Sequence, residues 1–156
     1  MPRRGRVNKR KTVPDSKYGS VLVQKFINKI MVVGKKSSAE KVFYGAMEDV
    51  EKKAGKEAVQ IFEAAVKNVT PLMEVKSRRV GGSTYQIPIE VERERGTAIA
   101  MKWLKESARE RAGRSMREKL AAEIFDAFSG TGGAMKKRED LHKTAESNKA
   151  FAHFRW

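Results

Sequence analysis

The side chains of this sequence that could do chemistry are mainly cationic, and they are densest at the N-terminus. No acidic residue precedes Asp15, and the first eleven positions include six cations: Arg3, Arg4, Arg6, Lys9, Arg10 and Lys11. Clustered cations favour nucleic acid because each neutralised phosphate releases counterions. The same charges repel one another and cannot form a core. We therefore expect residues 1–17 to form a disordered arm that orders on nucleic acid, with a merely solubilising tail as the alternative.

A second group of cations surrounds a pair of glycines in the middle of the chain. Lys76, Arg78 and Arg79 precede Gly81 and Gly82, and Thr84, Tyr85 and Gln86 follow within a few residues. Cations can contact phosphate, glycines allow close backbone approach, and an aromatic ring offers a stacking surface. The combination is typical of an RNA-binding turn. A solvated hairpin with Tyr85 packed at its base is the alternative.

Two further basic clusters are weaker signals because charged loops are usually just solvated. Lys35 and Lys36 form one pair, and the other cluster contains Arg109, Arg111, Arg114 and Arg117.

No group of residues has the spacing of a catalytic or metal site. The absence of cysteine excludes thiol nucleophiles, iron–sulfur clusters and cysteine-based zinc sites. His142 and His153 have neither metal-ligand spacing nor a neighbouring nucleophile. Three glutamates within residues 90–94 would share a strand face, but interleaved arginines favour surface ion pairs over metal binding. The sequence therefore predicts neither an enzyme nor a cofactor.

The last six residues are unusually aromatic for a chain terminus. Phe151, Phe154 and Trp156 fall there together with Arg155. Aromatic and arginine side chains are enriched at interfaces, whereas chain ends are normally polar and frayed. The tail is therefore expected to dock on a protein or RNA surface, with folding back onto its own domain as the alternative.

The composition indicates one domain that presents these groups to a polyanion. The 156 residues include 34 Lys and Arg against 19 Asp and Glu, a net charge of +15, of which residues 1–36 carry +10. A chain of this length and 40% hydrophobic content can bury a substantial core. No apolar run approaches the roughly 20 residues of a membrane span.

Apolar periodicity predicts the elements that position the cations. A period of 3.6 predicts helices over residues 21–34, 37–55 and about 57–69, the second opened by a capping box of Ser37 and Glu40. After Pro71 the period becomes 2, which predicts a β-hairpin at about 73–91 with its turn at the glycines. We expect this hairpin to be anchored at its base and to project its polar tip.

Helical periodicity then returns for the rest of the chain. Helices are expected from near residue 97 to 113, over 115–130 with a capping box of Ser115 and Glu118, and over 134–150 on the surface. The fold class is thus mainly α: one domain of about six helices at 18–150, with a hairpin protruding between helices three and four. The basic arm precedes it, and the aromatic tail of 151–156 follows it.

Three blocks resemble a known family. FINKIMVVGKKSSAEKVFYGA (residues 26–46), EVKSRRVGGSTYQIPIEV (74–91) and KKREDLHKTAESNKAFAHFRW (136–156) resemble bacterial members of the universal small-subunit ribosomal protein family number seven. The resemblance covers essentially the whole chain. It implies a cytoplasmic, non-enzymatic constituent of the small ribosomal subunit, in the head. There the family nucleates folding of the three-prime major domain of ribosomal RNA and borders the tRNA exit site.

The resemblance also assigns roles to individual residues. The implied ribosomal RNA contacts are Arg3, Arg4, Arg6, Lys9, Arg10, Lys11, Lys35, Lys36, Lys76, Arg78, Arg79, Arg114 and Met116. The residues implied to lie near exit-site tRNA and mRNA are Gly81, Gly82, Ser83, Thr84, Tyr85, His142 and Lys143. Phe151, Phe154, Arg155 and Trp156 would contact protein, with the eleventh small-subunit protein on the platform as the candidate partner.

Two other classes of protein are compatible with the composition alone. A helical regulator of double-stranded DNA would use the turn at Gly55 as a helix-turn-helix and the hairpin as a groove-reading arm. An RNA-processing enzyme is the third class, and the missing metal and nucleophile clusters argue against it.

Overall fold

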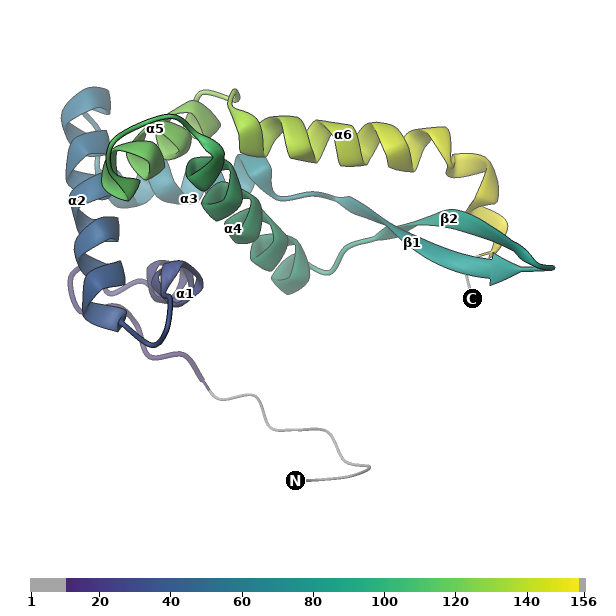
Figure 1. The fold of residues 1–156 in the computed structure, drawn as a ribbon, viewed down its shortest axis with the longest axis horizontal. Coiled ribbons are helices and arrows are strands. Elements are labelled where there is room, and N and C mark those ends of the chain that lie inside the picture. The colour runs from purple at the N-terminus through teal and green to yellow at the C-terminus, as the bar shows by residue number, and fades with distance from the viewer. Residues whose placement is uncertain (1–10, 155–156) are drawn as a thin grey trace.

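The computed structural model describes residues 11–154 of the chain. Within this range it contains six α-helices, one two-stranded antiparallel hairpin and a terminal 3-10 helix (Figure 1). The elements in chain order are α1 (Val21–Ile30), α2 (Lys36–Ala54), α3 (Ala58–Val69), β1 (Met73–Val80), β2 (Ser83–Glu90), α4 (Arg93–Glu110), α5 (Met116–Phe128), α6 (Gly133–Ser147) and η1 (Lys149–Phe154). The predicted fold class is confirmed, including the position of the hairpin between the third and fourth helices.

The core begins with three phenylalanines from the first three helices. Phe26 of α1, Phe43 of α2 and Phe62 of α3 are fully buried, and their ring centroids lie 5.0–5.6 Å apart. Tilted and edge-on aromatic pairs at this spacing are favourable beyond the apolar area that they bury. These rings fix how α1 packs on the α2–α3 pair.

Helix α3 lies at the centre of the bundle, in contact with α2, α4, α5 and α6. Near its end, the Asn68 side chain donates hydrogen bonds to the carbonyls of Ala127 and Phe128, each at 3.1 Å. These carbonyls belong to the last turn of α5, where backbone acceptors have no partner within the helix. Helix α3 therefore packs against α5 and also supplies the hydrogen-bond donor for the carbonyls at its end.

The hairpin is supported along its length and not only at its base. Figure 1 shows α6 running out from the helical body alongside the hairpin, with η1 folded back beside the strands. Helix α6 contacts β1, and η1 contacts β2. An isolated two-stranded hairpin is marginal in water, so this backing is physically needed. This backing by α6 and η1 was not predicted and adds to the expected anchoring at the base. The predicted surface position of α6 is confirmed, since only Ala134, Met135 and Ala145 of it are buried.

Three predicted helix boundaries were wrong. Helix α1 ends at Ile30, before a tight turn, and not at Gly34. Helix α4 begins at Arg93 and not near Thr97, whose hydroxyl donates to the Arg93 carbonyl at 2.8 Å. The charged residues between the predicted hairpin and the predicted helix thus form the first turn of α4. Helix α6 ends at Ser147, and a 3-10 helix continues into the tail.

Of the two predicted capping boxes, only the second is present in part. The Ser115 hydroxyl accepts a hydrogen bond from the Glu118 amide at 3.3 Å, as expected. Helix α2 instead begins at Lys36 with Lys35 as its N-cap, without a side-chain cap. The Ser37 prediction was wrong because the preceding turn leads into the helix early, so that the N-cap lies at Lys35, two residues before Ser37.

The described end of the N-terminal arm is tied to the body. Asp15 is 3% exposed, and its carboxylate accepts hydrogen bonds from the Tyr44 hydroxyl at 2.5 Å and from the amides of Lys17 and Tyr18. The Lys17 ammonium also pairs with Glu48 of α2 at 2.9 Å. The anchored part of the chain therefore begins by Asp15, slightly before the predicted boundary at residue 17.

Candidate nucleic-acid interface

The basic surface around α1 contains the predicted cations of the arm and of the α1–α2 loop. Lys11 and Lys36 line one depression of 400 Å³ together with Gln24 and Asn28 of α1. The structure thus brings the described end of the arm next to the lysine pair. Arg3, Arg4, Arg6, Lys9 and Arg10 lie outside the described residues.

A second depression joins residues far apart in the sequence. Lys35 and Met116 line it with Arg109, over a volume of 230 Å³, on a mainly apolar floor that includes Val42. Arg114 is exposed in the loop that leads to Met116. The predicted sites in the α1–α2 loop and before α5 are therefore neighbours on one surface.

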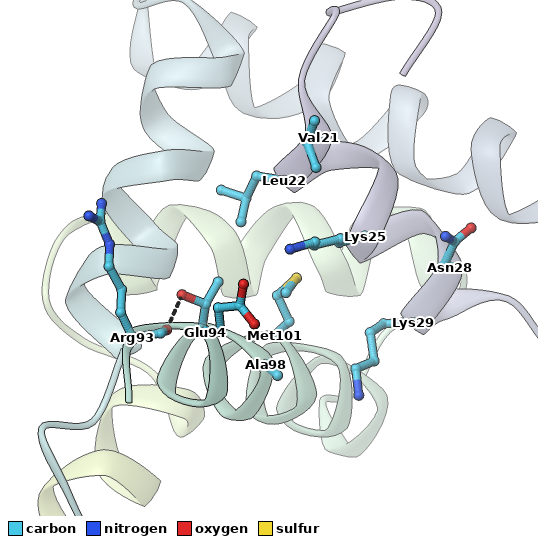
Figure 2. Close-up of a pocket in the computed structure, with 10 residues that line it drawn as sticks. Val21, Leu22, Lys25, Asn28, Lys29, Arg93, Glu94, Ala98 and Met101 are labelled. Atoms are coloured by element: carbon cyan, nitrogen blue, oxygen red, sulfur yellow. Dashed lines mark hydrogen bonds between the residues drawn. The ribbon is translucent and has the colours of Figure 1, made fainter. Parts of the chain in front are cut away.

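A third depression, the largest of the three, was not predicted from the sequence. This groove of 590 Å³ lies between α1 and α4. Figure 2 shows Lys25 of α1 pointing toward Glu94 and Met101 of α4, with Lys29 further along α1 and Arg93 at the opposite end of the groove. Lys25 and Lys29 are four residues apart, a spacing that places both on one helix face and could have indicated the site.

Electrostatics supports a continuous basic surface between the second and third depressions. The Lys105 ammonium donates a hydrogen bond to the Lys29 carbonyl at 2.9 Å. Burial lowers the pKa of Lys105, and repulsion from Arg109 and Lys29 lowers it further. Cations that repel one another in the free protein gain most from a polyanionic partner.

Two arginines of the 109–117 cluster are structural. Arg117 makes a bidentate pair with Asp49, with both nitrogen–oxygen distances 2.6 Å, and this hydrogen bonding lowers the pKa of Asp49. Arg111 pairs with the fully buried Glu123 at 2.7 Å and with Asp126. Arg109 and Arg114 make no ion pair within residues 11–154, so they are the members of the cluster available to a partner.

The hairpin divides its cations between two faces. Arg78 pairs with Tyr85 across the strands and Arg79 with Thr84, so alternation places Lys76 and Arg78 on one face and Arg79 on the other. Gly81 and Gly82 both have positive φ, 58° and 91°, as the predicted two-residue turn requires. Ser83 follows directly as the first residue of β2.

The aromatic tail contacts the hairpin of its own chain. The rings of Phe151 and Tyr85 lie 5.1 Å apart at 52°. Of the two alternatives for the tail, folding back therefore holds for Phe151, and one face of Tyr85 is covered. The Phe154 side chain and residues Arg155 and Trp156 lie outside the described part of the structure.

His142 has a structural partner at the base of the hairpin. Its Nε2 atom accepts a hydrogen bond from the Leu72 amide at 3.0 Å, so the ring is neutral with its proton on Nδ1. Burial lowers the pKa of His142, and the charge of Arg138 lowers it further. Lys143 is exposed on the next position of α6.

The structure also tests the DNA-binding alternative, the presence of a metal site and the presence of a membrane-spanning helix. A recognition helix after Gly55 would be α3, but this helix lies at the centre of the bundle, with six of its twelve residues buried and contacts to α2, α4, α5 and α6, which disfavours insertion into a DNA groove. In the described residues, no group of three or more acidic or histidine side chains could hold a metal ion. None of the helices in residues 11–154 is long and apolar enough to cross a membrane.

Comparisons with known proteins identify the family of this chain. A family model described as ribosomal protein S7p/S5e matches residues 2–149. The chain is 59% identical to the small ribosomal subunit protein uS7 of Carboxydothermus hydrogenoformans and 58% identical to that of Pelotomaculum thermopropionicum. It is 55% identical to the protein of the same name from Bordetella pertussis, and each alignment covers 100% of both chains. The chain therefore belongs to the ribosomal protein S7p/S5e family.

Proposed function

We propose that this protein is a structural constituent of the small ribosomal subunit that binds ribosomal RNA of the head through the basic surface around α1. The observation that carries the proposal is the clustering of Lys11, Lys36, Lys35 and Arg109 on adjoining depressions. Elements distant in sequence supply these cations, so one RNA bound there would contact several parts of the fold. Its relatives bear the name of a small-subunit protein, which supports the same assignment.

Assembly of the three-prime major domain follows from the same surface. The groove between α1 and α4 adds Lys25, Lys29 and Arg93 to one side of the lysine pair. A rigid helical body with several separate basic depressions can hold RNA segments from different parts of a folded domain together. This gives the protein a nucleating role in head assembly.

The hairpin and α6 extend away from the α1 surface and would serve the tRNA exit site (Figure 1). We assign the hairpin turn from Gly81 to Thr84, together with His142 and Lys143 on α6, to the neighbourhood of tRNA and mRNA. The tail beyond Phe151 is assigned to contact with a neighbouring protein, with the eleventh small-subunit protein as the candidate.

Salt-dependent binding to RNA of the three-prime major domain tests the central claim. Each lost phosphate contact should reduce the slope of log affinity against log salt by about 0.7–0.9. Deleting residues 1–11 removes six cations and should flatten the slope by several units, and replacing Lys35 and Lys36 by Ala should flatten it by one to two. The matched control replaces the exposed Lys52 and Lys53 at the far end of α2, where the slope should not change.

Two outcomes would contradict the proposal. Equal affinity for duplex DNA of the same length at matched salt would favour general polyanion binding. Failure of the wild-type protein to co-sediment with small subunits through high salt would exclude a stable structural role.

A further inference from the structure

The turn between α1 and α2 holds a valine in an unfavourable backbone conformation. The Lys35 amide donates to the Val32 carbonyl at 3.1 Å and closes a four-residue turn. Its two central residues, Val33 and Gly34, have φ of 53° and 73°. Positive φ at both positions is the pattern of a type I′ turn, which favours Gly, Asn and Asp. A β-branched residue at positive φ is a genuine outlier.

Nothing in the described part of the fold compensates for this strain by packing. The Val33 side chain is 89% exposed, and that of Val32 is 55% exposed. Val33 is the only non-glycine residue with positive φ among residues 11–154. Strained backbone positions cluster at functional sites, including sites that hold a ligand, where the strain is part of the function.

The surroundings of Val33 identify the chemistry of that partner. Lys35 and Lys36 follow within three residues and are both exposed, and Lys35 lines the depression that also contains Arg109 and Met116. The partner must therefore carry negative charge close to an apolar surface. RNA does so, because phosphates border the flat faces of bases and the ribose rings. Nucleic-acid-binding proteins also use exposed apolar side chains as wedges against bases.

We propose that the strained turn presents Val33 as an apolar contact for ribosomal RNA, against an unstacked base or its ribose, while Lys35 and Lys36 hold the flanking phosphates. This inference rests on the proposed function, which assigns the lysine pair to RNA. The Val33 contact is apolar and does not depend on the RNA sequence, whereas the other contacts proposed for this surface are between cations and phosphates.

Replacing Val33 by Asn tests the inference because Asn accepts the turn geometry without the apolar side chain. The Val33→Asn variant should melt a few degrees higher than the wild type. Its affinity for RNA of the three-prime major domain should fall about tenfold, as expected for losing one buried valine contact. The salt slope should stay unchanged because no cation is lost. A higher melting temperature together with a lower RNA affinity would show that Val33 serves binding, because a residue with only a structural role would not lower stability.

The matched control is Leu72→Asn, since Leu72 is 73% exposed but lies at the hairpin base. Its RNA affinity should equal that of the wild type. A Val33→Asn variant that is less stable would overturn the claim of strain, and one that binds RNA as tightly as the wild type would overturn the contact. Normal RNA binding with impaired joining of neighbouring proteins would assign Val33 to a protein interface and overturn the RNA assignment. Failure of the wild-type protein itself to bind this RNA would instead overturn the proposed function.

Discussion

At the scale of single residues, Gly45 makes room for an ion pair. A Cβ atom at this position in α2 would lie 2.8 Å from Cδ and 2.9 Å from Nε of Arg117. The Arg117 side chain crosses the glycine to reach Asp49, one turn further along α2. Glycine inside a helix costs about 1 kcal/mol relative to alanine. The close approach of Arg117 explains why α2 nevertheless has glycine at position 45.

Gly45→Ala should therefore change the pKa of Asp49 clearly while changing the free energy of unfolding little. Arg117 is flexible and partly exposed, so it should swing away and lose its bidentate pairing. The gain in helix propensity and the loss of an exposed pair are each about 1 kcal/mol or less, so the free energy of unfolding should change by less than about 1 kcal/mol. The pKa of Asp49 should rise toward its ordinary value, as measured by NMR titration of its carboxyl carbon. An unaltered pKa would show that the pair tolerates the methyl group.

His142 makes stability depend on pH. The folded protein lowers the pKa of this histidine, so as pH falls the unfolded chain takes up the proton first. The stability contributed by the neutral ring is complete above about pH 6.5 and is lost as pH falls through the folded pKa. Protonated Nε2 can no longer accept the Leu72 amide.

Between pH 7.5 and 5 the wild type should lose more thermal stability than His142→Ala, which lacks the group. His153→Ala keeps His142 and should follow the wild type across the same range. Melting temperatures are measured by circular dichroism. If they fall with pH equally for the wild type and His142→Ala, the ionisation of His142 does not affect stability.

At the scale of elements, the direction of α6 depends on a buried carboxylate. Glu123 of α5 is fully buried, and its Oε1 atom accepts a hydrogen bond from the Ala134 amide in the first turn of α6 at 2.8 Å. Its Oε2 atom lies 2.7 Å from Arg111 Nε. Gly132 is needed here, since a Cβ would lie 3.2 Å from Oε1, and its φ of 96° disfavours other residues. Glu123 thus joins α5, α6 and the end of α4.

Glu123→Ala should destabilise the protein by about 2–3 kcal/mol because it leaves the Ala134 amide unpaired and leaves Arg111 with Asp126 as its remaining acidic partner. Amides in the first turn of α6 should exchange with solvent faster than those of α3. Glu123→Gln keeps an acceptor and should lose less stability. The exposed Glu139→Ala on α6 serves as the control and should change stability by less than about 0.5 kcal/mol. Equal losses for the two alanine variants in denaturant unfolding would refute the role of Glu123.

The sequence predicts elements better than it predicts their contacts, for physical reasons. Apolar stripes with Phe26, Phe43 and Phe62 indicate helices because a helix must bury its stripe, and paired glycines indicate the hairpin because its turn needs positive φ. The start of α4 was missed because its first turn is charged and lacks an apolar signal. The docking of α6 and of Phe151 on the hairpin is not encoded in any local period. Likewise, Lys35 and Met116 line the same depression only because tertiary packing brings them together.

At the scale of the whole molecule, the α1 surface and the hairpin are separate parts of one chain. The basic depressions gather around α1, whereas the hairpin, α6 and the chain end form an extension from the helical body (Figure 1). The Phe26–Phe43–Phe62 core lies within the body and not in the extension. Local loosening of the extension should therefore leave the primary RNA surface intact.

Truncation after Ala150 tests this separation because it removes Phe151 from Tyr85. The ring pair of Phe151 and Tyr85 is worth about 0.5–1.5 kcal/mol beyond its area, and η1 otherwise contacts β2 and α6 of the extension, so the core should remain folded. Hydrogen exchange should accelerate in β1 and β2 but not in α3, and affinity for RNA of the three-prime major domain should match that of the full chain. Incorporation of late-joining subunit proteins should weaken if the tail also meets a neighbour.

A double-mutant cycle identifies the contact responsible for that loosening. Tyr85→Ala should accelerate exchange in the strands as the truncation does, and the two changes together should add little to either alone because each removes the same ring pair. Thr84→Ala, the neighbouring exposed position of β2, is the matched control and should leave exchange near the wild-type rate. Fully additive effects of Tyr85→Ala and the truncation would show that the tail stabilises the hairpin through other contacts, and global melting of the truncated chain would refute the independence of the body.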